Sequence, residues 1–187
     1  MRLYLPSLAV CCLSNLLLLA CASPLAARAP VDAKNLAYEL AGRFSLRESG
    51  RSFAGRVQWT HSAEGNVVLV QDPLGGGIAQ LTEQATLAQM KMSNGEARQA
   101  PTAQLLMQEL TGIALPVADL ARWLTGRTDL AVLRDAFGRT VQFEEGDWRI
   151  AYVYDSEASD ALPARIEALS KTGLELKLRV ESWELLK

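Results

Sequence analysis

Apolar and polar residues alternate with a period of two along most of the chain, which is the pattern of β-strands with one wet face. Residues 40–46 and 53–60 show this alternation first, with the turn sequence ESGRS between them. It is clearest at residues 174–181, where aliphatic side chains alternate with charged ones. Residues 67–70 are apolar at every position. That strand is therefore expected either to be covered on both sides or to use its outer face.

Two short helices interrupt this series of strands. They are predicted at residues 101–112 and 116–126, each of which opens with a proline and closes with a glycine. Further strands are predicted at residues 78–82, 85–92, 139–143, 148–155 and 163–169. A single sheet of about nine to eleven antiparallel strands tends to curl. The predicted fold is mainly β, an unclosed antiparallel β-barrel (a curled sheet) whose helical insert partly plugs an apolar cavity, the usual place for a hydrophobic ligand.

The N-terminal residues have the organisation of an export signal. Arg2 is the only charge before Arg28, and residues 3–20 are uncharged and mostly apolar. The sequence LLAC, which ends at Cys21, resembles the lipobox of bacterial lipoproteins, whose cysteine receives a diacylglyceryl group and an N-acyl chain. The alternative is an uncleaved membrane anchor, because about 18 such residues nearly span a bilayer. We expect a signal peptide at 1–20, an acylated flexible tether at 21–33 and one folded domain at 34–187.

Composition and charge narrow the function classes. All three cysteines lie at or before Cys21, so the folded domain is expected to have no disulfide framework and no thiol nucleophile. The formal net charge is −2 and becomes more negative if Arg2 is removed. Such a charge gives no indication of a basic surface that binds nucleic acid. Membrane attachment would then depend on the acyl chains of Cys21. We expect no cofactor beyond this covalent lipid, and no metal.

Enzyme chemistry has little support in the sequence. His61 is the only histidine, and we expect it to be a solvated hairpin residue. The glycine run at 75–77 is not followed by the Lys-Ser or Lys-Thr pair of a phosphate-binding loop. A hydrolase with a carboxylate pair remains an alternative, and the carboxylates that could supply it are Glu144, Glu145, Asp155 and Asp160. Acidic residues in loops are more often solvated, so we predict that the protein is not an enzyme.

Residues on the apolar phases of the strands and of the second helix are the candidates for a cavity lining. They are Phe44, Val57, Trp59, Leu69, Trp123, Trp148, Ile150 and Leu178. Trp183 falls on the polar phase of its strand, so it faces elsewhere unless a bulge resets the register.

The stretch QDPLGGGI at residues 71–78 contains one large apolar side chain, Leu74, among turn formers. On a protruding loop it would point into water and could probe a membrane. One leucine contributes about 1.5–3 kcal/mol on burial, which is enough to perturb lipid but not to anchor a protein. The alternative is that Leu74 folds back onto its own sheet.

A series of motifs along the chain carries a family resemblance. The segments GRFSLR and FAGRVQW, VQDPLG, TGIALPVADLARWLTG, GDWRIAY and LELKLRVESW occur in this order. Together with the lipobox they resemble the outer-membrane lipoprotein receptor family, LolB. The resemblance covers essentially the whole chain after the signal.

The resemblance implies a definite role. LolB proteins accept lipoproteins from a soluble periplasmic carrier, LolA, hold their acyl chains in an apolar cavity and insert them into the inner leaflet of the outer membrane. The family uses no nucleotide at that step, and the apolar residue of its protruding loop matches Leu74. We therefore expect a lipid-anchored, periplasm-facing monomer of the outer membrane, whose mild acidity would suit a carrier with a basic rim. The competing interpretation is a lipid-anchored carrier or scaffold for another apolar ligand.

Overall fold

The computed structural model describes residues 36–128, 130 and 132–186. The predicted signal peptide, the tether and its acylation site Cys21 lie outside these residues. None of the helices in the described part of the chain is long and apolar enough to cross a bilayer.

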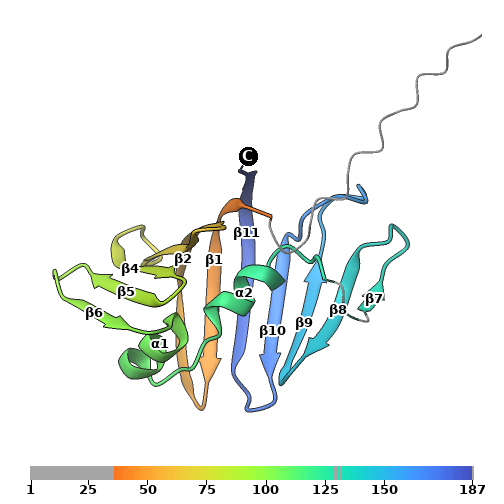
Figure 1. The fold of residues 1–187 in the computed structure, drawn as a ribbon. Coiled ribbons are helices and arrows are strands. Elements are labelled where there is room, and N and C mark those ends of the chain that lie inside the picture. Colours follow the sequence, from red (N-terminus) through yellow and green to blue (C-terminus); the bar gives the residue numbers. More distant parts are fainter. Residues whose placement is uncertain (1–35, 129, 131, 187) are drawn as a thin grey trace, which may run out of the picture. The chain divides into compact units, whose positions relative to one another are not determined.

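One sheet of 11 strands forms the described domain (Figure 1). Its strand order is β6-β5-β4-β3-β2-β1-β11-β10-β9-β8-β7, and every neighbouring pair is antiparallel. The strands are β1 Tyr38–Glu48, β2 Arg51–Ser62, β3 Gly65–Gln71, β4 Gly77–Gln84, β5 Leu87–Met92, β6 Ala97–Ala100, β7 Val132–Arg134, β8 Thr140–Glu145, β9 Trp148–Val153, β10 Arg165–Ser170 and β11 Glu175–Leu185. The sheet ends at β6 and β7, so the prediction of a mainly β, unclosed antiparallel sheet is confirmed.

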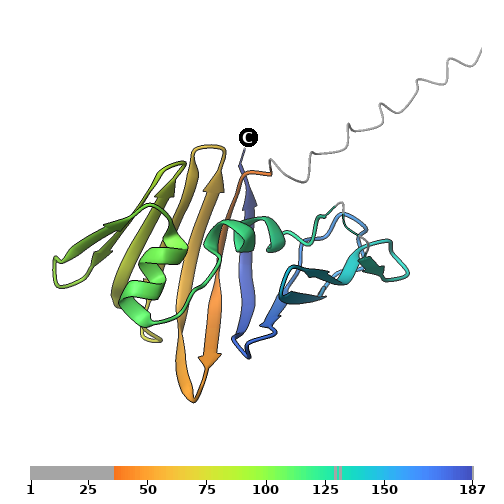
Figure 2. The same ribbon diagram turned by 60° about the horizontal axis from the view of Figure 1, so that its bottom comes forward.

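The two helices lie between β6 and β7 in the chain and cross the same face of the sheet (Figures 1 and 2). Helix α1 spans Ala103–Thr111; Thr102 caps its start by accepting a hydrogen bond from the Leu105 N–H. It ends at Gly112, whose positive φ of 75° favours glycine. Helix α2 spans Val117–Trp123. The chain therefore returns from one edge of the sheet to the other across this face.

The core lies between the helices and the sheet. The side chains at every second position of the strands are buried there, including Leu40, Val57, Trp59, Leu81, Ile150, Ile166, Leu176 and Leu178. This is the apolar phase that the alternation predicts. The short strands β6 and β7 were not predicted, because neither has enough residues to show alternation.

Strand β11 contains the irregularity that decides where Trp183 points. Gly42 of β1 pairs with Val180, but Ala41 pairs with Ser182, so Glu181 is an extra residue in β11. This bulge moves Trp183 onto the face of Leu40, its partner in β1. Its ring lies edge-on to Tyr38 with centroids 5.2 Å apart, and its indole N–H donates to the Pro163 carbonyl at 2.9 Å. A bulge therefore turns a residue of the polar phase toward the core.

Candidate functional site

Seven of the eight predicted lining residues lie on the helix side of the domain. Val57, Trp59, Trp123, Ile150 and Leu178 are buried, while Phe44 and Trp148 are partly buried against the same core cluster. Phe44 pairs with Leu178 on β11 and with Gly55 on β2. A Cβ at position 55 would lie 2.3 Å from the Gln71 carbonyl oxygen and 3.3 Å from the Phe44 ring, so glycine there permits the close approach of the β3 backbone.

The placement of Leu69 was wrong. Strand β3 pairs Val68 with Trp59 and Val70 with Val57, so Val68 and Val70 face the helices. Leu69 pairs with Gln58 and lies on the opposite face. Because residues 67–70 are apolar at every position, their pattern did not determine which phase is buried.

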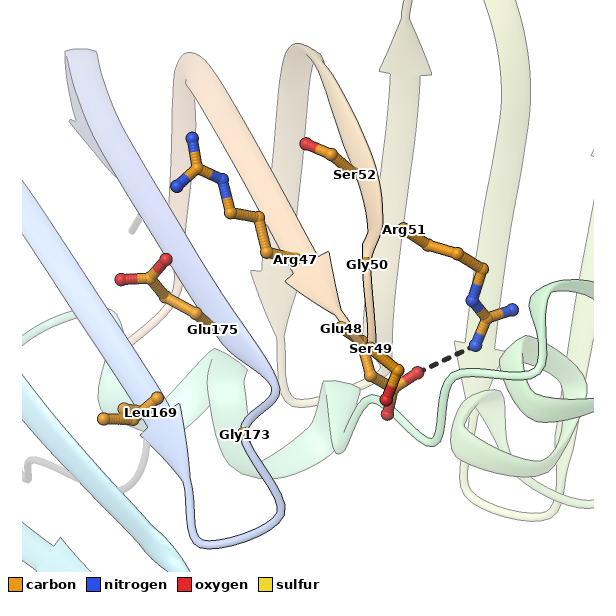
Figure 3. Close-up of a pocket in the computed structure, with 9 residues that line it drawn as sticks. All are labelled: Arg47, Glu48, Ser49, Gly50, Arg51, Ser52, Leu169, Gly173 and Glu175. Atoms are coloured by element: carbon orange, nitrogen blue, oxygen red, sulfur yellow. Dashed lines mark hydrogen bonds and ion pairs between the residues drawn. The ribbon is translucent and has the colours of Figure 1, made fainter.

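The helices pack closely onto these residues. Leu106 of α1, Leu120 of α2 and Leu124 are fully buried. A pocket of about 410 Å³ lies elsewhere, at the tips of the β1–β2 and β10–β11 hairpins (Figure 3). Its lining is mostly polar or charged, with Leu169 as the one large apolar side chain among the residues drawn. It is therefore not the apolar cavity expected from the sequence. The helix-facing side chains are covered by α1 and α2.

Helix α2 is held to the sheet by buried hydrogen bonds. The Tyr38 hydroxyl donates to the Ala121 carbonyl at 2.8 Å, and the Tyr152 hydroxyl donates to the Trp123 carbonyl at 2.6 Å. Burial raises the pKa of both tyrosines, so both stay protonated and able to donate. The two bonds fasten the last turn of α2 to β1 and β9.

A carboxylate on β8 adds a second attachment for α2. Glu145 accepts from the Arg122 guanidinium at 2.7 Å and from the Trp123 indole N–H at 2.8 Å. Partial burial acts to raise the pKa of Glu145, but the hydrogen bonds from Arg122 and Trp123 and the charge of Arg122 outweigh it, so the pKa lies below its ordinary value. The sequence suggested a solvated acidic residue. In the sequence, Glu144 and Glu145 are two acidic residues before a turn. Nothing in that local pattern indicates that Glu145 will contact a helix more than 20 residues away.

Aromatic rings surround the Trp123 side chain. Its ring centroid lies 5.8 Å from that of Trp148 and 6.4 Å from that of Phe143, which in turn stacks on Tyr152 at 6.1 Å. Such rings bury large areas in specific geometries. The part of the sheet beneath α2 is therefore aromatic and closely fitted.

Helix α1 is attached differently. Its first N–H, at Ala103, donates to Glu83 on β4 at 3.0 Å. Near its other end the Thr111 carbonyl accepts from Arg51 in the β1–β2 hairpin at 2.6 Å, and Arg51 also pairs with Glu48 at 3.0 Å (Figure 3). Both of these attachments are at least partly exposed to solvent.

Methionines replace aromatics in the core around α1. Met90 and Met92 come from β5, which contacts α1, and Met107 lies on the helix. Methionine side chains are flexible and polarizable, so they adapt to gaps of irregular shape.

His61 has a structural role rather than the solvated position that we expected. Its side chain is partly buried, its ring lies 5.3 Å from that of Tyr38, and its Nδ1 is 2.9 Å from the Asn66 side-chain oxygen. The same oxygen accepts from the Trp59 indole N–H at 3.1 Å. Within the described residues, no group of three or more His, Cys, Asp or Glu side chains is placed to hold a metal ion.

The loop between β3 and β4 presents Leu74 to solvent, with 97% of the residue exposed. The Asp72 carboxylate accepts from the N–H groups of Leu74 at 2.7 Å and Gly76 at 3.0 Å. Gly75 has a φ of +96°, and a side chain on Gly76 would meet the Asp72 carboxylate at 2.6 Å. The glycines thus permit a tightly bonded turn, and the alternative in which Leu74 folds back onto its sheet is wrong.

Known proteins share this architecture and sequence. A family model described as "Outer membrane lipoprotein LolB" matches residues 36–183. The outer-membrane lipoprotein LolB of Azoarcus sp. (strain BH72) is 34% identical over 184 residues, which is 95% of each chain. That of Dechloromonas aromatica (strain RCB) is also 34% identical, over 79% of this chain and 81% of its own length.

Among solved structures, a Vibrio parahaemolyticus domain named for outer membrane lipoprotein sorting is similar with a TM-score of 0.52. It is 10% identical and covers 83% of this chain and 88% of its own, so that similarity concerns the fold alone. The family model covers residues 36–183, which is nearly all of the described domain, and the relatives match 79% and 95% of the chain. This chain belongs to the LolB family of outer-membrane lipoproteins.

Proposed function

We propose that this protein accepts lipoproteins from a soluble LolA-like periplasmic carrier and inserts them into the inner leaflet of the outer membrane. It acts as a monomer anchored through an acylated Cys21, and it catalyses no covalent reaction. Family membership supports the receptor role. The observation that carries the insertion step is Leu74, fully exposed on a loop that Asp72 holds in shape.

The helix-facing residues are the place for the acyl chains. Burial between the apolar side of the sheet and the helices is non-directional, so a chain can slide in without breaking specific bonds. Because α1 and α2 cover these residues in the structure, room for a chain has to come from movement. The α1 end is suited to this, since its core is rich in methionine and its attachment to Arg51 is exposed to solvent.

Transfer without a nucleotide requires a decreasing free energy along the route. The receptor must bind the acyl chains more tightly than the carrier does, and the bilayer must hold them more tightly still. Leu74 lowers the barrier of the last step by entering the lipid, because its burial gives about 1.5–3 kcal/mol and therefore perturbs the bilayer reversibly.

The test is Leu74→Glu, assayed with lipoprotein-loaded carrier and receptor-bearing liposomes. We expect capture from the carrier to be unchanged and delivery into the liposomes to fall at least tenfold, because the glutamate carries a charge that lipid excludes. Leu133→Glu is the matched control, since Leu133 is a 61% exposed leucine on the edge strand β7. Undiminished delivery by Leu74→Glu, or equal loss in both variants, would contradict the insertion role.

Acylation is tested separately by mass spectrometry of the mature N-terminus. A chain that begins at Cys21 and carries three acyl chains is expected. A chain with an unmodified cysteine would remove the anchor from the proposal. Competition by lipoprotein-loaded carrier for ligand that copurifies with the protein would separate the receptor from a carrier of some other apolar ligand.

A further inference from the structure

Four arginines form a row across the face of the sheet opposite the helices. Arg56 on β2 pairs directly with Arg43 on β1, Arg43 pairs with Arg179 on β11, and Arg179 pairs with Arg165 on β10. Neighbouring strands lie about 4.8 Å apart, so the row extends over about 14 Å. We call these residues the arginine row.

Like charges in directly opposite positions of a sheet destabilise it, so folding alone gives no reason for this arrangement. One carboxylate offsets part of the charge. Glu181, the extra residue of the β11 bulge, contacts Arg43 at 2.8 Å and Arg56 at 3.1 Å. Within the described part of the chain no salt bridge joins Arg179 or Arg165 to an acidic group.

Other charged groups on this face do not neutralise the row. Lys177 lies two residues from Arg179 toward the hairpin ends and contacts Glu175 at 2.9 Å and Glu167 at 3.8 Å. Glu39 and Glu184 pair with each other four residues from Arg43, toward the chain termini. The row is therefore a band of excess positive charge, and its side chains are accessible, with 65% of the Arg43 side chain exposed.

The arginine row begins at the base of the Leu74 loop. Arg56 pairs with Gln71, the last residue of β3, and the Gln71 side chain donates to the Gly75 carbonyl at 3.3 Å. The loop also adjoins Ile78, which is 46% exposed. A positive band that is continuous with exposed apolar side chains matches a lipid surface, which offers phosphates and hydrocarbon together. An acidic protein surface would give no role to the leucine.

We propose that the arginine row is a docking surface for the phosphate groups of an anionic bilayer, which turns the outer face of the sheet toward the membrane while Leu74 inserts. Arginine suits this task because its planar guanidinium binds phosphate through paired hydrogen bonds. The inference rests on the proposed function, since it gives the orientation in which insertion takes place. Removing one arginine is expected to weaken face-down binding about fivefold.

The test measures the distance of this face from lipid in the full, lipid-anchored protein. Ser45→Cys places a fluorophore on the outer face two residues from Arg43, and nitroxides on lipid headgroups quench it at short range. We expect strong quenching on vesicles that contain phosphatidylglycerol and little on pure phosphatidylcholine. The double variant Arg165→Gln/Arg179→Gln, or high salt, should abolish the difference. Lys91→Gln/Arg98→Gln removes the same charge from the edge strand β6 and its neighbour β5 and should have no effect.

Quenching that is independent of lipid charge, or insensitive to Arg165→Gln/Arg179→Gln, would overturn the proposal. So would a double variant that keeps its quenching but no longer captures lipoprotein from the carrier, because the row would then bind an acidic protein. The same samples are assayed for lipoprotein delivery. If the unmodified protein delivers nothing, the proposed function fails while the quenching result still decides on the docking surface. The double variant is expected to fold, since it removes a like-charge pair.

Discussion

The two helices cover one face of the same sheet but are attached to it in different ways. Helix α2 buries four of its seven residues, and its carbonyls accept hydrogen bonds from two buried tyrosines. Helix α1 buries two of its nine residues, Ala103 and Leu106; its hydrogen bond to Glu83 is partly buried and its hydrogen bond from Arg51 is exposed. A buried hydrogen bond is costly to break because the separated groups lose water as well as each other, whereas exposed groups are rehydrated.

The side chains that the sheet places under the two helices also differ in how rigid they are. Aromatic rings in fixed geometry lie under α2, and flexible methionines lie under α1. The comparison indicates that α2 is the fixed part of the helical insert and α1 the part that moves when acyl chains enter. The helical insert can therefore both cover the apolar face of the sheet, through α2, and open it, through α1.

The largest effect is expected from Trp123→Ala. The change removes a 3% exposed indole, its contacts with Trp148 and Phe143 and its bond to Glu145. The free energy of unfolding should fall by about 3–5 kcal/mol, measured by urea denaturation. Met107→Ala, the corresponding truncation on α1, should cost clearly less, because the site is partly exposed and adaptable. Equal losses would mean that the two helices are equally fixed.

A smaller loss is expected from Tyr152→Phe, which removes one of the two donors to the Trp123 carbonyl and keeps the ring; the Gly126 N–H, at 3.0 Å, remains. We expect a decrease in the free energy of unfolding of about 0.5–1.5 kcal/mol and faster hydrogen exchange at the amides of α2. Tyr154→Phe is the control, because its hydroxyl bonds to the Thr140 carbonyl away from α2. Faster exchange in α1 instead of α2 would contradict the assignment of α2 as the fixed helix.

The attachment of α2 through Glu145 should also depend on pH. Because the pKa of Glu145 is lower in the folded protein than its ordinary value of 4.5, its contribution is fully present at neutral pH. The contribution is lost as the pH falls below 4.5 through the folded-state pKa. Glu145→Gln should therefore be less stable than the unmodified protein at pH 7, and the difference in urea midpoint should shrink toward pH 3. Glu144→Gln, on the opposite face of β8, is the control for removing a carboxylate from this strand.

Much of this architecture follows from local patterns in the sequence. The alternation in β1, β2, β9 and β11 predicted which side chains face the core, because one apolar face is enough to fix the phase of a strand. The exposure of Leu74 also followed, since residues 71–78 combine turn formers with a single leucine. The features that were missed have no local signal. Residues 67–70 show no alternation, and the bulge that reorients Trp183 is defined by the pairing of β11 with β1.

The difference between the two helices could not have been predicted either. Both have proline before them and glycine after them in the sequence, and both carry an apolar stripe. What separates them is the set of distant residues that they meet, among them Tyr38, Tyr152 and Glu145 for α2 and Arg51 and Glu83 for α1. These partners lie between 20 and 83 positions away along the chain, so only the folded arrangement shows which helix is firmly attached.

The smallest effect on stability, and the most direct test of movement, is expected from Arg51→Gln. The side chain is 47% exposed, so losing its bonds to the Thr111 carbonyl and to Glu48 should cost about 1 kcal/mol or less. The amides of α1 should nevertheless exchange faster, because the C-terminal end of the helix loses its attachment to the hairpin. Those of α2 should be unchanged. A fluorescent fatty acid should associate faster with the variant, since α1 opens more often.

Arg47→Gln is the matched control for this last experiment. Arg47 lies in the same β1–β2 hairpin, where it pairs with Ser52 on β2 and Glu175 on β11. Its position in the strand is on the face away from the helices. It should alter neither the exchange of α1 nor the association of the fatty acid. If Arg51→Gln leaves both unchanged, the exposed hydrogen bond does not control α1. Entry of acyl chains would then have to follow movement of α2 or of the sheet edge. If both helices exchange faster together, the helical insert opens as one unit and the difference between its two halves has no consequence for ligand entry.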